Sequence, residues 1–457
     1  MPRLIEIDWP DHGMPDLPPA LSLAELDARL DLVRAGMEAR GFGTLVVYGD
    51  REHAANLHWL TGFDPRFEEA LLVVTPGAAQ LLVGNECLPY ADISPLVAAG
   101  RIAAHLVPSL SLISQPRRGM RLREAIERFV PMGGRIGAAG WKYWGPEEVD
   151  NPATALDLPS VLADLLRTRG RVENAGEMFM HPGHGLRCTV DAAEIARLEF
   201  ANAVAARAVR RMAFALREGM TDFEAVEEAR LPGLPLSCHV TFATGARAHQ
   251  GMSSPTGEVL RRGSPASFNV APQGANICRA GWVATSEADL PEGARDTLGA
   301  FVGPYFEAMS DWCGLMRPGV GGGQVWEHMM NRLPPDLFGV TLNPGHLIGM
   351  DEWISSPVFR DSDLPLRSGM AMQMDVIPGH PVHATTRLED GYVIADEALR
   401  ADLAARFPEV AGRCEARAGF MRGTLGMDVP ETLLPLADTC GILAPFLLAP
   451  RRVLTLG

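Results

Sequence analysis

The chain has 457 residues, of which 47% are hydrophobic and 21% charged, an ordinary globular composition with room for two or three domains. Its 56 acidic residues outnumber 41 basic ones, and the formal net charge of −15 argues against nucleic acid or an anionic membrane as the main partner. No apolar run approaches the ~18 residues of a spanning helix. Seven scattered cysteines without a Cys-x-x-Cys pair indicate reduced thiols, so we expect a cytoplasmic protein.

Residues 1–185 are predicted to form an N-terminal α/β domain. The stretch from Ser22 to Glu25 has the pattern of a capping box, and the helix it opens has an apolar face that continues to Met37. Buried-strand patterns follow at residues 44–48, 70–74 and 80–83. Helical and strand patterns then alternate to about residue 180, which is typical of an α/β domain.

Residues 186–400 are predicted to form a second domain, followed by an extension over residues 401–457. A long helical pattern begins at Ala192 and stops near Gly219, and a second capping box follows at Thr221. The extension contains a helical pattern and ends in a mostly apolar segment. We expect that segment to pack on the second domain or on a subunit partner.

Three segments of the second domain carry the candidate chemistry. The first, residues 343–350, holds His346 between two glycines. The second is an apolar run over residues 371–377 that contains Asp375, and the third places Glu389 at the mouth of another strand. One histidine and two acids with this spacing are predicted to converge on one pocket.

These segments read GH-x-IG, LxxGM, an acidic strand residue and RxED-G-x-V. In this order they resemble the C-terminal catalytic domain of the creatinase, aminopeptidase P and methionine aminopeptidase family, whose fold is called pita-bread. The WLTGF stretch at residues 59–63 is similar to the N-terminal domain of the same family, so the resemblance spans about residues 25–395. It implies an α/β N-terminal domain plus an α+β pita-bread C-terminal domain. In metal-dependent members, the positions matching His346, Asp375 and Glu389 are metal ligands.

The chain departs from the metal-dependent pattern at two ligand positions. The first ligand aspartate falls on Asn269, and the second, eleven residues later, falls on Ala280. An asparagine is a weak neutral ligand and an alanine is none. Creatinase shows the same pair and works without metal, so we expect neither metal nor cofactor here.

Two further departures concern the expected substrate site. The guanidinium-binding glutamate of creatinase falls on Trp282, and the second histidine of the GH-x-IG segment falls on Trp353. An aromatic ring can hold a cation by its π face, but the hydrogen-bonded pairing would be lost. The two tryptophans therefore suggest an apolar or planar substrate group, with simple core packing as the equal alternative.

The resemblance assigns roles to three more residues. His249 follows a strand and turn where creatinase keeps its general acid and base, and an imidazole pKa of about 6.5 suits both tasks. Arg66 and Phe67 follow a Gly-Phe pair at which creatinase carries a loop that grips the substrate carboxylate. The alternatives are a loop histidine without a role and a surface arginine paired with Glu68 or Glu69.

The leading hypothesis is a metal-independent, creatinase-like hydrolase of a C–N bond in a small amidine-, guanidine- or amide-containing molecule. In it His249 moves the proton, while Asp375 and Glu389 bind a cationic group or orient the water. The remaining substrate-binding positions are then Arg66, Phe67, His346, Asn269, Trp282 and Trp353.

Several alternatives stay open at this point. They are a metal-dependent Xaa-Pro aminopeptidase-like peptidase, a lyase on the same scaffold, and a non-catalytic binding module. A mononuclear metal site built from His346, Asp375, Glu389 and either His380 or His383 also remains possible. The expected partners are a small-molecule substrate and a second copy in a two-fold dimer, in which the N-terminal domain of one subunit covers the active site of the other.

Overall fold

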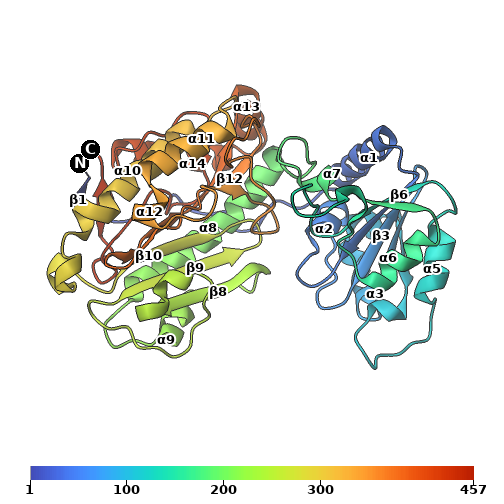
Figure 1. Cartoon of the computed structure of the whole chain (residues 1–457), viewed down its shortest axis with the longest axis horizontal. Coiled ribbons are helices and arrows are strands. Elements are labelled where there is room, and N and C mark those ends of the chain that lie inside the picture. Colours follow the sequence, from blue (N-terminus) through green and yellow to red (C-terminus); the bar gives the residue numbers. More distant parts are fainter. Residues whose placement is uncertain (1) are drawn as a thin grey trace. The chain divides into compact units, whose positions relative to one another are not determined.

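The computed structural model describes residues 2–457, which fold into two compact units (Figure 1). The smaller unit is Ala20–Arg187, and the larger unit combines residues 2–19 with Cys188–Gly457. This division differs from the sequence-based one because residues 2–19 and 401–457 both belong to the larger unit. Within the described residues, no helix is long and apolar enough to cross a membrane.

The smaller unit is built on one mixed six-stranded sheet. Its strands in spatial order are β5 (Ala103–Leu106), β4 (Ala79–Val83), β3 (Ala70–Val74), β2 (Thr44–Gly49), β6 (Arg135–Ala139) and β7 (Arg171–Asn174). The pairs β4–β5, β2–β6 and β6–β7 are parallel, whereas β2–β3 and β3–β4 are antiparallel. Its helices are α1 (Leu23–Arg40), α2 (Ala55–Thr61), α3 (Cys87–Tyr90), α4 (Pro95–Ala98), α5 (Leu122–Phe129), α6 (Ser160–Arg167) and α7 (Glu177–Met180).

Local sequence signals set the ends of α1. The predicted capping box is confirmed, because Ser22 Oγ accepts from the Glu25 backbone N–H and Glu25 Oε2 accepts from the Ser22 backbone N–H. Gly41 ends the helix in the left-handed region at φ 69°, where a side chain would be strained. The buried face of α1 includes Leu26, Val33 and Met37, which matches the predicted apolar stripe.

The larger unit contains two four-stranded antiparallel sheets. The first has the order β15 (Arg387–Glu389), β10 (Ile277–Trp282), β9 (Pro265–Pro272) and β8 (Leu236–Thr244), and the second has the order β11 (His346–Leu347), β12 (Ala371–Gln373), β16 (Gly391–Ile394) and β17 (Leu433–Pro435). Two-stranded pairs form between β1 (Arg3–Glu6) and β18 (Arg452–Thr455), and between β13 (Gly379–His380) and β14 (Ala384–Thr385). The helices are α8 (Ala192–Ala215), α9 (Asp222–Glu227), α10 (Gly303–Leu315), α11 (Gly322–Arg332), α12 (Pro335–Phe338), α13 (Glu397–Arg406) and α14 (Pro408–Gly423). The long helix α8 packs against β9 and β10 (Figure 1).

A buried ion pair ties the strands of the first sheet to the C-terminal residues. Arg279 on β10 lies 2.9 Å from both carboxylate oxygens of Asp390, which joins β15 to β16. Arg279 also donates to the backbone carbonyls of Thr439 and Ile442 at 2.7 and 3.0 Å. The C-terminal residues thus supply acceptors that this buried guanidinium needs.

A second polar network fixes the C-terminal helix α14 to α8. Glu199 on α8 is fully buried and accepts from Arg413 at 2.8 and 2.9 Å, while Arg417 lies 2.8 Å away. Arg417 also donates to Asp438 at 2.7 Å, and Asp438 accepts from the backbone of His12. Residues 401–457 are therefore an integrated part of the larger unit.

The buried Arg279–Asp390 pair leads to a prediction about the stability of the larger unit. Arg279→Met keeps most of the side-chain volume but leaves the Asp390 carboxylate buried without its counter-charge, which costs about 3–5 kcal/mol of unfolding free energy. Arg332→Met, which removes an exposed arginine near Asp311 and Glu307, should cost at most about 1 kcal/mol. Urea unfolding followed by circular dichroism measures both values. Equal losses in the two variants would contradict the anchoring role of Arg279.

Candidate functional site

The register of the first sheet places Cys278 in one row with two predicted site residues. Cys278 on β10 lies directly opposite Asn269 on β9 and opposite Glu389 on β15. Residues opposite each other on neighbouring strands point to the same face, so these three side chains lie side by side. The eleven-residue spacing in the sequence had assigned the second ligand position to Ala280. In the sheet, Cys278 occupies the row of Glu389, and Ala280 lies two residues further along β10 on the same face, opposite Arg387. The assignment of the second ligand position to Ala280 stays a prediction.

The second sheet supplies His346 and the hairpin that follows it. The backbone of Leu347 pairs with Ser355, so the chain reverses and brings residues 352 and 353 back to the histidine. Glu352 Oε1 lies 3.2 Å from His346 Nε2, and the Trp353 ring stacks on the imidazole with centroids 4.1 Å apart. Glu352 was not singled out from the sequence, because nothing local in the sequence shows that this hairpin folds back on His346.

The geometry of the resulting cluster suits a cation. His346, Glu352 and Glu389 each offer one ligand atom, and these atoms lie within 4.8 Å of one another. Asp375 Oδ2 lies 3.9 Å from His346 Nε2, and its other oxygen is buried without a hydrogen-bond partner. The Leu347 carbonyl lies 3.2 Å from His346 Nδ1 and can only accept, so it places the proton on Nδ1 and directs the Nε2 lone pair at the carboxylates.

Burial and crowding perturb the ionisation of this cluster. Burial raises the pKa of Asp375 to about 6, and burial together with the charges of Asp375 and Glu352 raises the pKa of Glu389 well above its ordinary value. Burial alone would lower the pKa of His346, but the nearby Glu352 and Asp375 carboxylates outweigh it and raise that pKa. The cluster therefore needs positive charge, which protons supply in the metal-free chain and a cation would supply in a loaded one.

Buried amides orient the carboxylates. Asn276 and Gln373 donate to Glu389 Oε1 at 2.8 and 3.2 Å, and Asn276 also donates to Glu352 at 3.3 Å. Asn276 is held in turn by Asn269, whose Nδ2 donates to it at 3.0 Å. These contacts leave Glu389 Oε2 as the oxygen without amide donors. Sequence reasoning singled out neither Asn276 nor Gln373, because buried amides carry no recognisable spacing.

The donor set fits one divalent cation better than two. The side-chain oxygen of Asn269 accepts from the backbone and hydroxyl of Thr241 at 2.9 and 2.6 Å, so it is not available as a ligand. Burial raises the pKa of the Cys278 thiol to about 12, so it is protonated at neutral pH. One imidazole with carboxylates is a suitable set for a single transition-metal ion, whereas a second ion would lack anionic ligands in this row.

A separate cavity of about 760 Å³ contains three of the other predicted residues, His249, Trp282 and His380. His249 is exposed on the short helical turn η4 (Gly245–Gln250), and its backbone carbonyl accepts from Arg387 at 3.0 Å. The other terminal nitrogen of Arg387 lies 3.8 Å from Cys278 Sγ. Arg387 therefore connects the cavity wall to the row that contains Glu389.

The histidines proposed as a fourth ligand lie elsewhere. His380 and His383 stack on each other at 4.7 Å and both contact Phe301. Over residues 2–457, the ligand group around His346 contains Glu352 and neither of these histidines. Glu352 thus takes the position that the sequence had left open.

The loop with Arg66 and Phe67 belongs to the smaller unit. Arg66 donates to the Tyr90 hydroxyl at 3.1 and 2.8 Å and lies 3.4 Å from Asp64, so its partners differ from the predicted Glu68 or Glu69. Phe67 is half exposed, at 49%. Their role toward a substrate stays a prediction.

The raised pKa of Asp375 gives a pH-dependent stability prediction for the metal-free chain. Its folded pKa of about 6 exceeds the ordinary 3.8, so the folded chain binds the proton more tightly and loses stability as pH rises through this window. Asp375→Asn should therefore stabilise metal-stripped protein at about pH 7.5 by an amount on the order of 1–3 kcal/mol, and the gain should vanish near about pH 4. Denaturant titrations at both pH values measure it, with the exposed Asp336→Asn as control. A gain that does not change with pH would contradict the assignment.

Comparison with known proteins gives matches among solved structures alone. No family model matches the chain, and no curated protein matches it by sequence. The prolidase from Pyrococcus horikoshii superposes with a TM-score of 0.62 at 15% identity, covering 80% of this chain and 95% of that one. The X-Pro aminopeptidase from Thermotoga maritima gives 0.61 at 14% identity over 81% and 95%, and a variant of Escherichia coli aminopeptidase P gives 0.56 at 14% over 85% and 99%.

These findings correct the leading functional hypothesis. The metal-independent, creatinase-like hypothesis is wrong, because the similar structures are prolidases and Xaa-Pro peptidases and because the ligand atoms of His346, Glu352 and Glu389 lie close enough together to hold a metal ion. The predicted fold class is confirmed: the chain has the pita-bread fold of the creatinase and aminopeptidase P family.

Proposed function

We propose that the chain is a metal-dependent hydrolase that cleaves an amide C–N bond in short peptides of the Xaa-Pro type. The observation that carries the proposal is the buried group of His346, Glu352 and Glu389, with Asp375 beside it. The similar structures, which include prolidases and an Xaa-Pro dipeptidase, support the choice of bond.

The same residues would hold a single divalent cation. His346 Nε2, one oxygen each of Glu352 and Glu389, and Asp375 are the available ligand groups. When bound, the cation would supply Lewis-acid polarisation of the scissile carbonyl and a lower pKa for the attacking water.

Contacts around the ligand residues fix their tautomer and orientation before a cation binds. The Leu347 carbonyl keeps the His346 proton on Nδ1, and Asn276 and Gln373 hold the Glu389 carboxylate in one orientation. Trp353 covers one face of the His346 ring and limits the access of water to it. These contacts fix the ligands in advance, which is what catalysis by a preorganised site requires.

The cavity lined by His249 and Trp282 suits an uncharged part of the substrate, such as a proline ring. Among the described residues that line it, none is Asp, Glu, Lys or Arg, and its walls include Trp282, Pro291 and Val382. A guanidinium or amidinium group would find no carboxylate there, whereas a proline ring suits apolar walls. His249 lies at the same wall, where it would donate a proton to the leaving nitrogen.

The function is tested by assaying dipeptides with a C-terminal proline after reconstitution with Mn²⁺, Co²⁺ or Zn²⁺. We expect a chelator to abolish the hydrolysis and added cation to restore it. Glu352→Gln should bind the cation at least about tenfold more weakly, whereas Glu327→Gln on the exposed face of α11 should bind it normally. Full turnover in metal-stripped protein would refute the proposal.

We also propose that the active form is a two-fold dimer with shared sites, as the family resemblance implies. The test co-expresses two inactive variants, Arg66→Ala and His249→Ala. If sites are shared, a mixed dimer contains one site with both lesions and one with neither, so activity returns. If each subunit builds its own site, every site keeps one lesion and the mixture stays inactive. A monomeric mass by light scattering would also exclude the proposal.

A further inference from the structure

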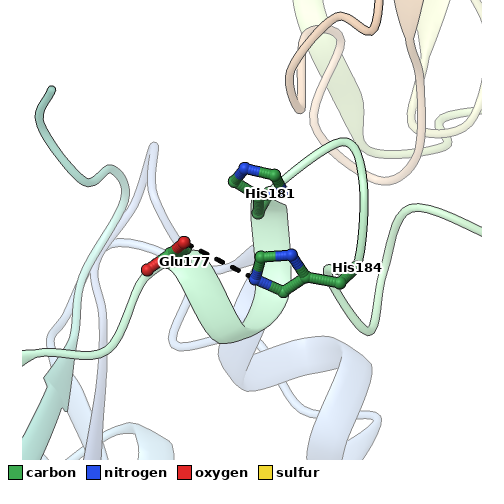
Figure 2. Close-up of side chains that lie close together, drawn as sticks. All are labelled: Glu177, His181 and His184. Atoms are coloured by element: carbon green, nitrogen blue, oxygen red, sulfur yellow. Dashed lines mark ion pairs between the residues drawn. The ribbon is translucent and has the colours of Figure 1, made fainter. Parts of the chain in front are cut away.

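The smaller unit contains a second group of ligand-type side chains outside the site described above. Glu177, His181 and His184 each offer one ligand atom, and the three atoms lie within 4.8 Å of one another (Figure 2). We propose that this 177–184 triad binds a divalent transition-metal ion of the zinc type. The proposal does not depend on the function assigned to the larger unit.

The backbone holds the triad in place. The short helix α7 ends at Met180, and the loop that follows turns back on it, because Leu186 and Arg187 donate to the carbonyls of Met178 and Phe179 at 2.9 and 3.0 Å. A side chain at Gly185 would meet the Phe179 carbonyl at 2.6 Å, so only glycine fits this turn. The turn brings His184 Nε2 to 3.5 Å from Glu177 Oε1.

The side chains suit a particular class of ion. The rings of His181 and His184 stack with centroids 4.0 Å apart, and Figure 2 shows Glu177 facing His184 with His181 beside them. Two imidazoles and one carboxylate are a familiar zinc set that leaves a fourth position for water or another ligand. Calcium and magnesium prefer sites built from oxygen alone.

The affinity should be moderate. Glu177 and His184 are about half exposed, and the Gly183 N–H donates to His181 Nδ1 at 3.0 Å. A cation that takes this nitrogen replaces a backbone hydrogen bond, so we expect micromolar binding, weaker than at a buried four-ligand site. A bound ion would link α7 to the loop that follows it, near the C-terminal end of the smaller unit.

The test counts zinc bound to full-length, tag-free protein after metal stripping and equilibrium dialysis against Zn²⁺ at a concentration well above the expected micromolar Kd, so that the site is saturated. His346→Ala serves as the background, because it removes the only imidazole of the ligand group in the larger unit. Adding His184→Ala should lower the bound zinc by one ion per chain. Adding His328→Ala, a histidine of similar exposure paired with one carboxylate at 3.1 Å, should leave it unchanged.

The same comparison in the wild-type background keeps the test valid if the His346→Ala variant misfolds. There, His184→Ala should again lose one zinc per chain, whether or not the site in the larger unit is loaded. If the proposed function is wrong because the His346 site binds no metal, removal of His184 should still lower the zinc count by one ion per chain. An unchanged zinc count on removal of His184 in both backgrounds would overturn the proposal.

Discussion

The larger unit depends on the alternation of side chains along two neighbouring strands. On β10 and at the end of β15, Cys278 and Glu389 face the candidate site, while Arg279 and Asp390 form the buried ion pair behind it. Arg279 also donates to the carbonyls of Thr439 and Ile442, so residues near the end of the chain help to hold the strands that contain the site. A buried charge without its partner costs several kcal/mol, so the loss of either residue alone should weaken the larger unit.

Charge balance explains the composition of the site. Buried carboxylates repel one another, and a cluster of them is stable only with enough positive charge. Here Asn269 and the protonated Cys278 thiol add no negative charge to the row that contains Glu389. A single divalent cation would offset most of the charge of Glu352, Asp375 and Glu389, and the amides of Asn276 and Gln373 orient the Glu389 carboxylate.

Much of the local structure could be predicted from the sequence. The capping boxes at Ser22 and Thr221 begin α1 and α9 as expected, and the apolar periodicity from residue 192 gives α8. The motifs around His346 and Glu389 were sufficient for the fold, which the similar structures confirm. The functional hypothesis failed because it took the neutral Asn269 and Ala280 to exclude a metal and overlooked Glu352, which the hairpin after Leu347 brings to His346.

The sequence by itself determined what depends on near neighbours: helix ends, buried strands, the glycine-bounded histidine and the acidic strand residues. These features follow from interactions over a few residues, which leave a readable pattern. Of the two acids predicted to lie on strands, Glu389 is on β15, whereas Asp375 lies two residues after the end of β12. The tertiary structure alone decided which side chains share the site. The register of β9, β10 and β15 and the hairpin after Leu347 are long-range pairings, and a shift of one residue would turn each side chain to the opposite face. For that reason Glu352, Cys278 and Asn276 could be recognised only after the strands were paired.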